Sequence, residues 1–70
     1  MNNAKTYTDK RGWRFRVMPG LGGDVFKARY QKPDATGWHG VAALPWRESL
    51  EEAQADLDRM AREKGWRAAA

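Results

Sequence analysis

The stretch "RGWRFRV" at residues 11–17 decides the fold, because it alternates apolar side chains with arginines. A β-strand turns successive side chains to opposite faces, so the pattern predicts a strand over residues 11–18 with two unlike faces. One face carries Arg14 and Arg16. The other supplies half of a small core and consists of Trp13, Phe15 and Val17.

Two further strands follow from the same reasoning. The segment "PGLGGD" (19–24) is typical of a turn, and "VFKARYQ" (25–31) alternates again, with Lys27 and Arg29 on its polar face. After a second turn, "WHGVAAL" (38–44) is the expected third strand. Short connections between the three strands predict an antiparallel meander.

After residue 48 the spacing of apolar residues changes from every second position to the spacing of a helix, so the sequence predicts a helix there. Ser49 followed three residues later by Glu52 forms a capping box, and Gly65 suits the C-terminal cap. Apolar residues recur at helical spacing between them, at Leu50, Ala53, Leu57, Met60 and Ala61. The acidic side chains of this helix, Asp56 and Asp58 among them, are expected on its solvated face.

The expected fold class is α+β: a three-stranded antiparallel β-meander packed against one C-terminal α-helix (β-β-β-α). With 70 residues the chain suits one domain. We expect a flexible N-terminal arm over 1–10, a single β-β-β-α domain over 11–66, and a short C-terminal tail over 67–70. The one helix can cover only one face of the sheet.

Composition argues against several classes of function. The chain has no cysteine and one histidine, His39, so disulfides, metal sites and nucleophile–base pairs are hard to assemble. Its sole serine, Ser49, is better used as a helix cap. We therefore expect no enzymatic activity, no catalytic residues, no metal and no cofactor. No apolar run resembles a signal peptide or a membrane span, so we expect a cytoplasmic protein without membrane contact.

Charge is unevenly distributed along the chain. Residues 1–32 carry eight basic and two acidic side chains, whereas residues 48–70 carry four basic and six acidic ones. Such asymmetry points to an anionic partner for the basic half, nucleic acid before membrane. If the helix covers the apolar side of the sheet, four cations share the bare face: Arg14, Arg16, Lys27 and Arg29.

This bare face has two interpretations. It is either a solvated face whose charge prevents aggregation, or a surface that binds phosphates and bases, as guanidinium groups do in bidentate fashion. The tryptophans likewise allow two roles: Trp38 and Trp46 either pack on the core or offer exposed rings to a partner or a base.

The order of elements resembles the AP2-type DNA-binding domain and the arm-binding N-terminal domains of phage-type integrases. The resemblance rests on "GWRFRV", "FKARYQKP", Trp38 and the helix "SLEEAQADLDRMARE", over about residues 11–64. It implies a sheet docked in the major groove of duplex DNA. By position, the DNA contacts are Arg14, Arg16, Lys27 and Arg29, with Trp38 as a contact or support.

We therefore expect a small non-enzymatic DNA-binding module, such as a phage or bacterial accessory protein. One alternative is a protein-interaction module, for example a phage-encoded inhibitor, whose partner contacts Trp46, Arg47 or the basic sheet face. Another is a structural subunit that dimerises through its sheet edge. The oligomeric state does not follow from the sequence.

Overall fold

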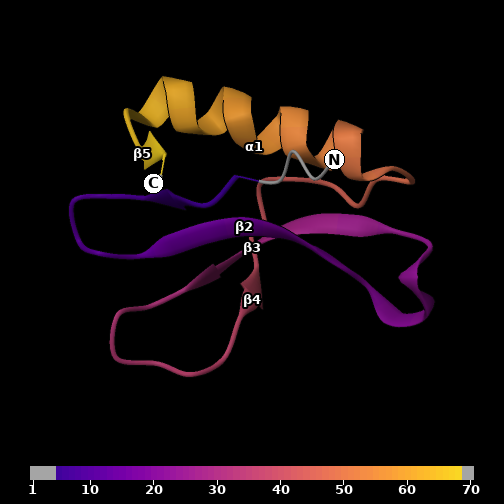
Figure 1. Ribbon diagram of the computed structural model, residues 1–70, viewed down its shortest axis with the longest axis horizontal. Coiled ribbons are helices and arrows are strands. Elements are labelled where there is room, and N and C mark those ends of the chain that lie inside the picture. Colours follow the sequence, from indigo (N-terminus) through magenta and orange to yellow (C-terminus); the bar gives the residue numbers. More distant parts are fainter. Residues whose placement is uncertain (1–4, 69–70) are drawn as a thin grey trace.

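A hairpin of two six-residue strands is the centre of the fold. The computed structural model describes residues 5–68 and places β2 at Arg14–Pro19 and β3 at Phe26–Gln31 (Figure 1). The strands are antiparallel, with Arg16 opposite Arg29 and Val17 opposite Ala28. This register keeps the two alternating patterns in phase, so Phe15 and Val17 share a face with Ala28 and Tyr30, whereas Met18 lies on the face of the cations.

Three strands of two residues each complete the sheet, which is antiparallel in the order β4-β3-β2-β1-β5. They are β1 (Tyr7–Thr8), β4 (His39–Gly40) and β5 (Arg67–Ala68). The α+β class is confirmed, but the prediction of three strands was wrong, because the sheet has five. Strands this short contain no alternation that a sequence pattern can reveal.

The short strands also change the expected boundaries. β1 lies within the segment 1–10 that was expected to be an arm, and β5 begins the expected tail 67–70. The third strand, expected over 38–44, is reduced to β4. Residues 1–4 and 69–70 lie outside the described residues.

Helix α1 (Leu50–Lys64) begins and ends at the predicted caps. The backbone N–H of Glu52 donates a 3.1 Å hydrogen bond to the hydroxyl oxygen of Ser49, whose own O–H donates to the Glu52 carboxylate at 3.2 Å. At the other end Gly65 adopts a left-handed conformation with φ of 75°, and its N–H donates to the carbonyl of Ala61. A glycine suits this cap because a Cβ atom disfavours positive φ.

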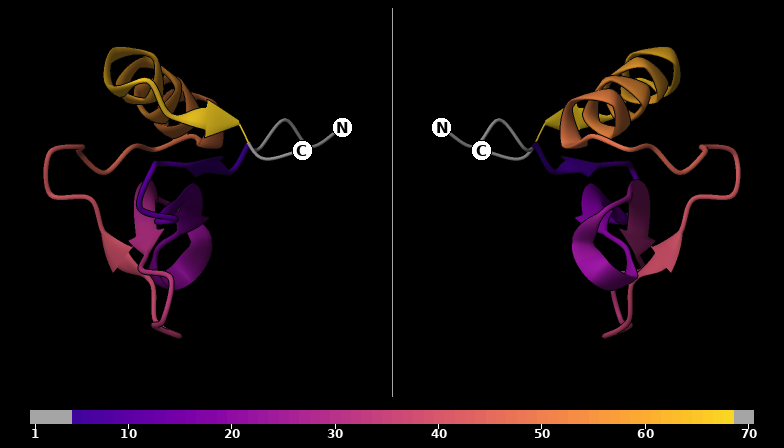
Figure 2. Two further views of the ribbon diagram at one scale, coloured as in Figure 1. Left: turned by 90° about the vertical axis from the view of Figure 1, so that its left-hand side faces the viewer. Right: turned by 90° about the vertical axis from the view of Figure 1, so that its right-hand side faces the viewer.

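The helix covers one face of the β2–β3 hairpin, while β4 and the segment before it lie on the side away from the helix (Figure 2). Leu57 is completely buried at their contact, and Trp66 folds back from the helix end to stack on Phe15 at a ring-centroid distance of 3.8 Å. The remaining buried apolar residues are Tyr7, Val17, Ala28, Leu44, Ala53 and Ala61.

Two aspartates of the helix are tied to other elements. Asp56 is 5% exposed and accepts hydrogen bonds of 2.7 and 3.2 Å from the Arg47 guanidinium, while Asp58 accepts from the Tyr7 hydroxyl at 2.6 Å. The prediction that both carboxylates are solvated was wrong, because β1 and the segment before the helix supply donors to them. These bonds fasten both chain segments to the helix.

The capping box gives a first testable outcome. We expect Ser49→Ala to lower the free energy of unfolding by about 1 kcal/mol, because the N–H of Glu52 loses its acceptor. Thermal denaturation followed by circular dichroism measures this loss. Ser49→Thr is the control, since the threonine hydroxyl can accept from the Glu52 N–H and donate to the Glu52 carboxylate, so this variant should melt close to the wild type. Equal melting of Ser49→Ala and the wild type would contradict the role of this cap.

The Tyr7–Asp58 bond predicts a loss of stability in alkali. The hydrogen bond to Asp58, together with burial, raises the pKa of Tyr7 from 10.0 to about 12. Because the unfolded chain releases this proton first, the bond stabilises the fold fully below pH 10 and its contribution is lost as the pH rises towards 12. Chemical denaturation at increasing pH should therefore show a steeper loss for the wild type than for Tyr7→Phe. Parallel curves for the two proteins would refute this coupling.

Candidate nucleic-acid interface

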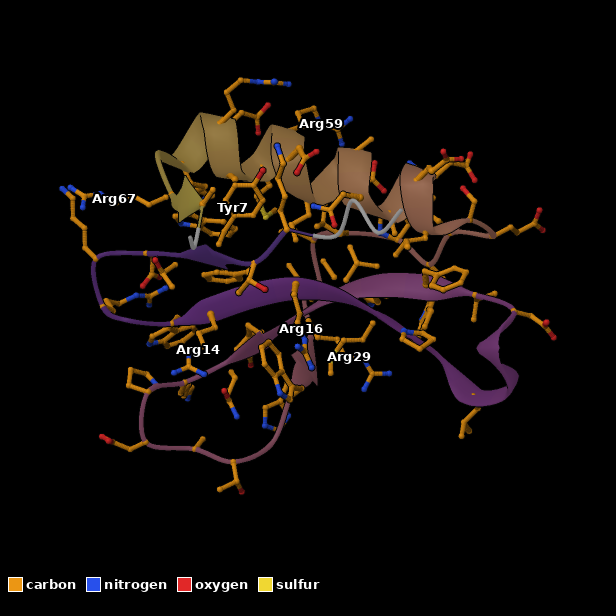
Figure 3. All side chains as sticks on the ribbon, in the orientation of Figure 1. Tyr7, Arg14, Arg16, Arg29, Arg59 and Arg67 are labelled. Carbon is orange, nitrogen blue, oxygen red and sulfur yellow. The ribbon has the colours of Figure 1, made fainter. Side chains whose placement is uncertain are left out.

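The register of the central hairpin gathers four cationic side chains on the face opposite the helix. Arg16 and Arg29 are cross-strand partners, Lys27 lies opposite Met18, and Arg14 lies opposite Gln31. Figure 3 shows the labelled arginines of both strands on the side of the hairpin away from α1. The structure thus brings together all four cations that the sequence placed on one face. We call this surface the four-cation face; it consists of Arg14, Arg16, Lys27 and Arg29.

The charge of the four-cation face is not neutralised within the described chain. Across residues 5–68, no carboxylate oxygen lies within 4.0 Å of any of its four charged groups. The three ion pairs of this region lie elsewhere and join Arg11 to Asp9, Arg47 to Asp56 and Arg59 to Asp56. Four uncompensated cations on two neighbouring strands repel one another unless salt or an anion screens them.

Tryptophan rings flank the cations. The Arg16 guanidinium carbon lies 4.7 Å from the ring centroid of Trp38, a partly buried residue that comes just before β4. The amine of Lys27 and the guanidinium of Arg29 lie 5.6 and 5.8 Å from the ring of Trp46. Cations at these distances are attracted by the ring electrons, so the two indoles restrict where the charged groups point.

Arg29 has an unmet hydrogen-bonding group. Its Nε atom is shielded from solvent and has no hydrogen-bond partner among the described residues. A buried N–H without a partner destabilises the free protein, and a ligand acceptor would remove that penalty. Arg14 is the contrasting case, since it is exposed and makes neither an ion pair nor a cation–π contact within residues 5–68.

A neighbouring cluster escaped the sequence reasoning. The ring of Trp13 has the Arg11 guanidinium 3.8 Å from its centroid and the Lys32 amine at 5.3 Å, and it stacks on Tyr30 at 5.3 Å. Arg11 and Lys32 lie in the turns that flank β2 and β3. Only folding brings them together, and no periodicity of the sequence marks them. Arg11 is neutralised there by its 2.8 Å ion pair with Asp9, whereas Lys32 makes no ion pair within residues 5–68.

Arg47 and Trp46 differ, although both were expected to face a protein partner. The Arg47 side chain is occupied by its 2.7 Å ion pair with the buried carboxylate of Asp56. Trp46 is 47% exposed, and its ring lies so close to Gly20 that a Cβ there would approach it to 2.7 Å. Trp46 therefore remains open to a partner beside the β2–β3 turn, whereas the Arg47 guanidinium is held by the helix.

The described part of the chain contains little that suggests other chemistry. Residues 5–68 hold no group of three or more His, Cys, Asp or Glu side chains arranged to bind a metal ion. No helix found there is sufficiently long and apolar to cross a membrane. Comparison of the chain with protein-family models, curated proteins and solved structures returns no match.

The uncompensated charge predicts an unusual response to salt. We expect the free energy of unfolding to rise by a few tenths to about 1 kcal/mol as screening of the opposed cations increases. The relevant interval is about 0.01 to 0.15 M salt, over which the Debye length falls from about 30 to about 8 Å. Urea denaturation at the two ends of this salt interval measures the change in the free energy of unfolding. The double variant Arg16→Gln/Arg29→Gln should lose most of this rise. A wild type that salt weakens would contradict it.

Proposed function

We propose that the protein is a small, non-enzymatic duplex-DNA-binding module that uses the four-cation face. The observation that carries this proposal is the gathering of three arginines and a lysine, which make no ion pair within residues 5–68, on the sheet face away from the helix. Arginine binds phosphate and the edge of guanine in bidentate fashion, which a solubilising surface does not require.

The dimensions of the hairpin suit a groove of duplex DNA. The major groove is about 12 Å wide and admits a two-stranded β-ribbon. Residues two apart on a strand, such as Arg14 and Arg16, advance by roughly 6.8 Å, which equals about two base-pair steps of 3.4 Å. The spacing of alternate side chains along the face therefore matches the spacing of every second base pair.

The contacts with tryptophan support different roles for the cations within this proposal. Trp38 restricts Arg16, and Trp46 restricts Arg29, so these two cross-strand partners are the candidates for contacts of defined geometry. Arg14 is free of such contacts and suits a phosphate of the backbone, and so does the Lys27 amine, which is a point charge without the planar fork of arginine. The proposal agrees with the resemblance to AP2-type and integrase arm-binding domains. It implies a phage or bacterial accessory protein that acts in the cytoplasm.

Binding to random duplex DNA at several salt concentrations tests the proposal. If four side chains neutralise phosphates, the slope of log K against log salt should be near −3.6. Arg14→Gln/Arg29→Gln should make that slope about 1.8 units shallower. Fluorescence anisotropy of a labelled duplex supplies the affinities.

Arg59→Gln is the control variant for a single lost charge. Arg59 lies on the outer side of α1, 3.7 Å from Asp56, so its loss should leave the slope unchanged (Figure 3). The proposal fails if the wild type shows no binding at low salt. It also fails if the control weakens binding more than Arg14→Gln or Arg29→Gln does.

One observation favours the alternative of a protein-interaction module. Leu21 is fully exposed in the β2–β3 turn, next to Gly20, on which the half-exposed Trp46 packs. Exposed apolar groups near one turn are more typical of protein interfaces than of DNA contacts. Absence of DNA binding together with a protein partner lost on Leu21→Ser would favour this function. Dimerisation through a sheet edge gains no support from edge strands only two residues long.

A further inference from the structure

A second basic region lies at the end of the molecule formed by the β1–β2 turn and the C-terminus of α1. A hollow of about 470 Å³ is lined there by Thr8, Asp9, Lys10, Gly65 and Arg67. A second hollow of about 310 Å³ shares Asp9, Lys10 and Gly65 with the first and adds Arg11, Lys64 and Trp66. We call the two together the turn hollow. Ligand pockets commonly occupy about 300–1,000 Å³.

The sheet explains why residues distant in sequence line one hollow. β5 pairs with β1, which sets Arg67 directly opposite Thr8. Gly65 ends the helix, and its left-handed conformation turns the chain towards β5. In Figure 3 the Arg67 side chain extends from the same end of the molecule as the β1–β2 turn. Three cations thus come from three elements: Lys10 from the turn, Lys64 from the helix and Arg67 from β5.

The sole carboxylate that lines the turn hollow, Asp9, is already engaged in an ion pair and in hydrogen bonds. Asp9 pairs with the Arg11 guanidinium at 2.8 Å and accepts hydrogen bonds from the backbone N–H groups of Arg11 and Trp13. Burial raises the pKa of Asp9, but these hydrogen bonds outweigh it and hold the pKa below its ordinary value. Arg11 and Asp9 therefore cancel each other, and Lys10, Lys64 and Arg67 make no ion pair within residues 5–68.

The helix end does not account for this excess of charge. Its last carbonyl groups amount to about half a negative charge, which one cation in the last turn, such as Lys64, already offsets. Lys10 and Arg67 belong to other elements and are not needed for that purpose. The turn hollow thus keeps roughly two and a half positive charges above neutrality, next to the hydroxyl of Thr8 and a glycine without a side chain.

We propose that the turn hollow is a second anion site, separate from the four-cation face, that binds a phosphate group through Lys10, Arg67 and Lys64. A phosphoryl group carries the charge and the acceptor oxygens that these donors lack in the free protein. The phosphate comes from one of two sources, the backbone of a nucleic acid or a free phosphorylated metabolite. The recognising groups are the same in both cases.

Titration with sodium pyrophosphate, followed by ¹⁵N–¹H correlation spectra, tests for the site. Sodium chloride of equal ionic strength is the reference. We expect saturable shifts for the backbone amides of Thr8, Lys10, Gly65 and Arg67, while Arg16 and Arg29 report the four-cation face separately. Lys10→Gln/Arg67→Gln should weaken binding at the turn hollow at least about tenfold for each lost contact. It should leave any shifts at Arg16 and Arg29 in place.

Lys27→Gln/Arg59→Gln is the matched control, because it removes two charges away from the turn hollow. The shifts at Lys10 and Gly65 should persist in this variant. Non-saturating shifts, or shifts at these amides that Lys10→Gln/Arg67→Gln leaves unchanged, would overturn the proposal. Since all four substituted side chains are on the surface or partly exposed, the spectrum of each variant also verifies that it is folded.

A duplex-DNA arm of the same experiment identifies the source of the phosphate. If the turn hollow binds the DNA backbone, Lys10→Gln/Arg67→Gln should reduce the salt slope of DNA binding by about 1.8 units. An unchanged slope, together with pyrophosphate binding, assigns the site to a free phosphorylated ligand. Because the pyrophosphate arm does not involve DNA, the turn hollow and the proposed function can fail independently.

Discussion

The pairing register of β2 and β3 is the constraint on which the rest of the molecule depends. With Val17 opposite Ala28 and Arg16 opposite Arg29, the apolar side chains that alternate with the cations face the helix, and the four cations face away. A slip of either strand by one residue would exchange the two faces and bury guanidinium groups beneath α1. Burial of unpaired charges is so costly that the helix itself enforces the register.

The helix is in turn held by polar bonds as much as by its small apolar stripe. Leu57 is the largest side chain that is fully buried, and alanines fill much of the remaining contact. Arg47, just before the helix, bonds to Asp56, and Tyr7, in β1, bonds to Asp58, so the charged side of the helix is also fastened to the rest of the fold. For a chain that buries little surface, such bonds compensate for the modest core.

Sequence patterns captured the parts of the fold that depend on local order. Alternation in β2 and β3 predicted the four-cation face, and the Ser49 and Gly65 caps marked the helix ends. Strands β1 and β5 escaped prediction, because they depend on pairing with other strands, β1 with β2 and β5 with β1, and on the bond from Tyr7 to Asp58. The helical pattern was read from apolar residues alone, so it could not reveal that Asp56 pairs with Arg47, nine positions earlier.

The candidate site, like the fold, could be predicted from the sequence only in part. Its cations follow from strand parity, whereas the ring that faces each cation depends on how loops fold back over the sheet. Trp46 reaches Lys27 and Arg29 only because the chain before the helix pairs with β3 through Arg47 and Phe26. Loop closure of this kind leaves no periodic trace in a sequence.

The separation of charge between sheet and helix has a kinetic consequence. Residues 48–64 carry six acidic and three basic side chains, and the acidic pair Glu51 and Glu52 occupies the first turn, so the molecule is an electric dipole. In the field of a polyanion such a molecule rotates before contact, and most encounters present the sheet. If the partner is the proposed DNA, this orientation during approach raises the association rate, and added salt lowers that rate more than it raises the dissociation rate.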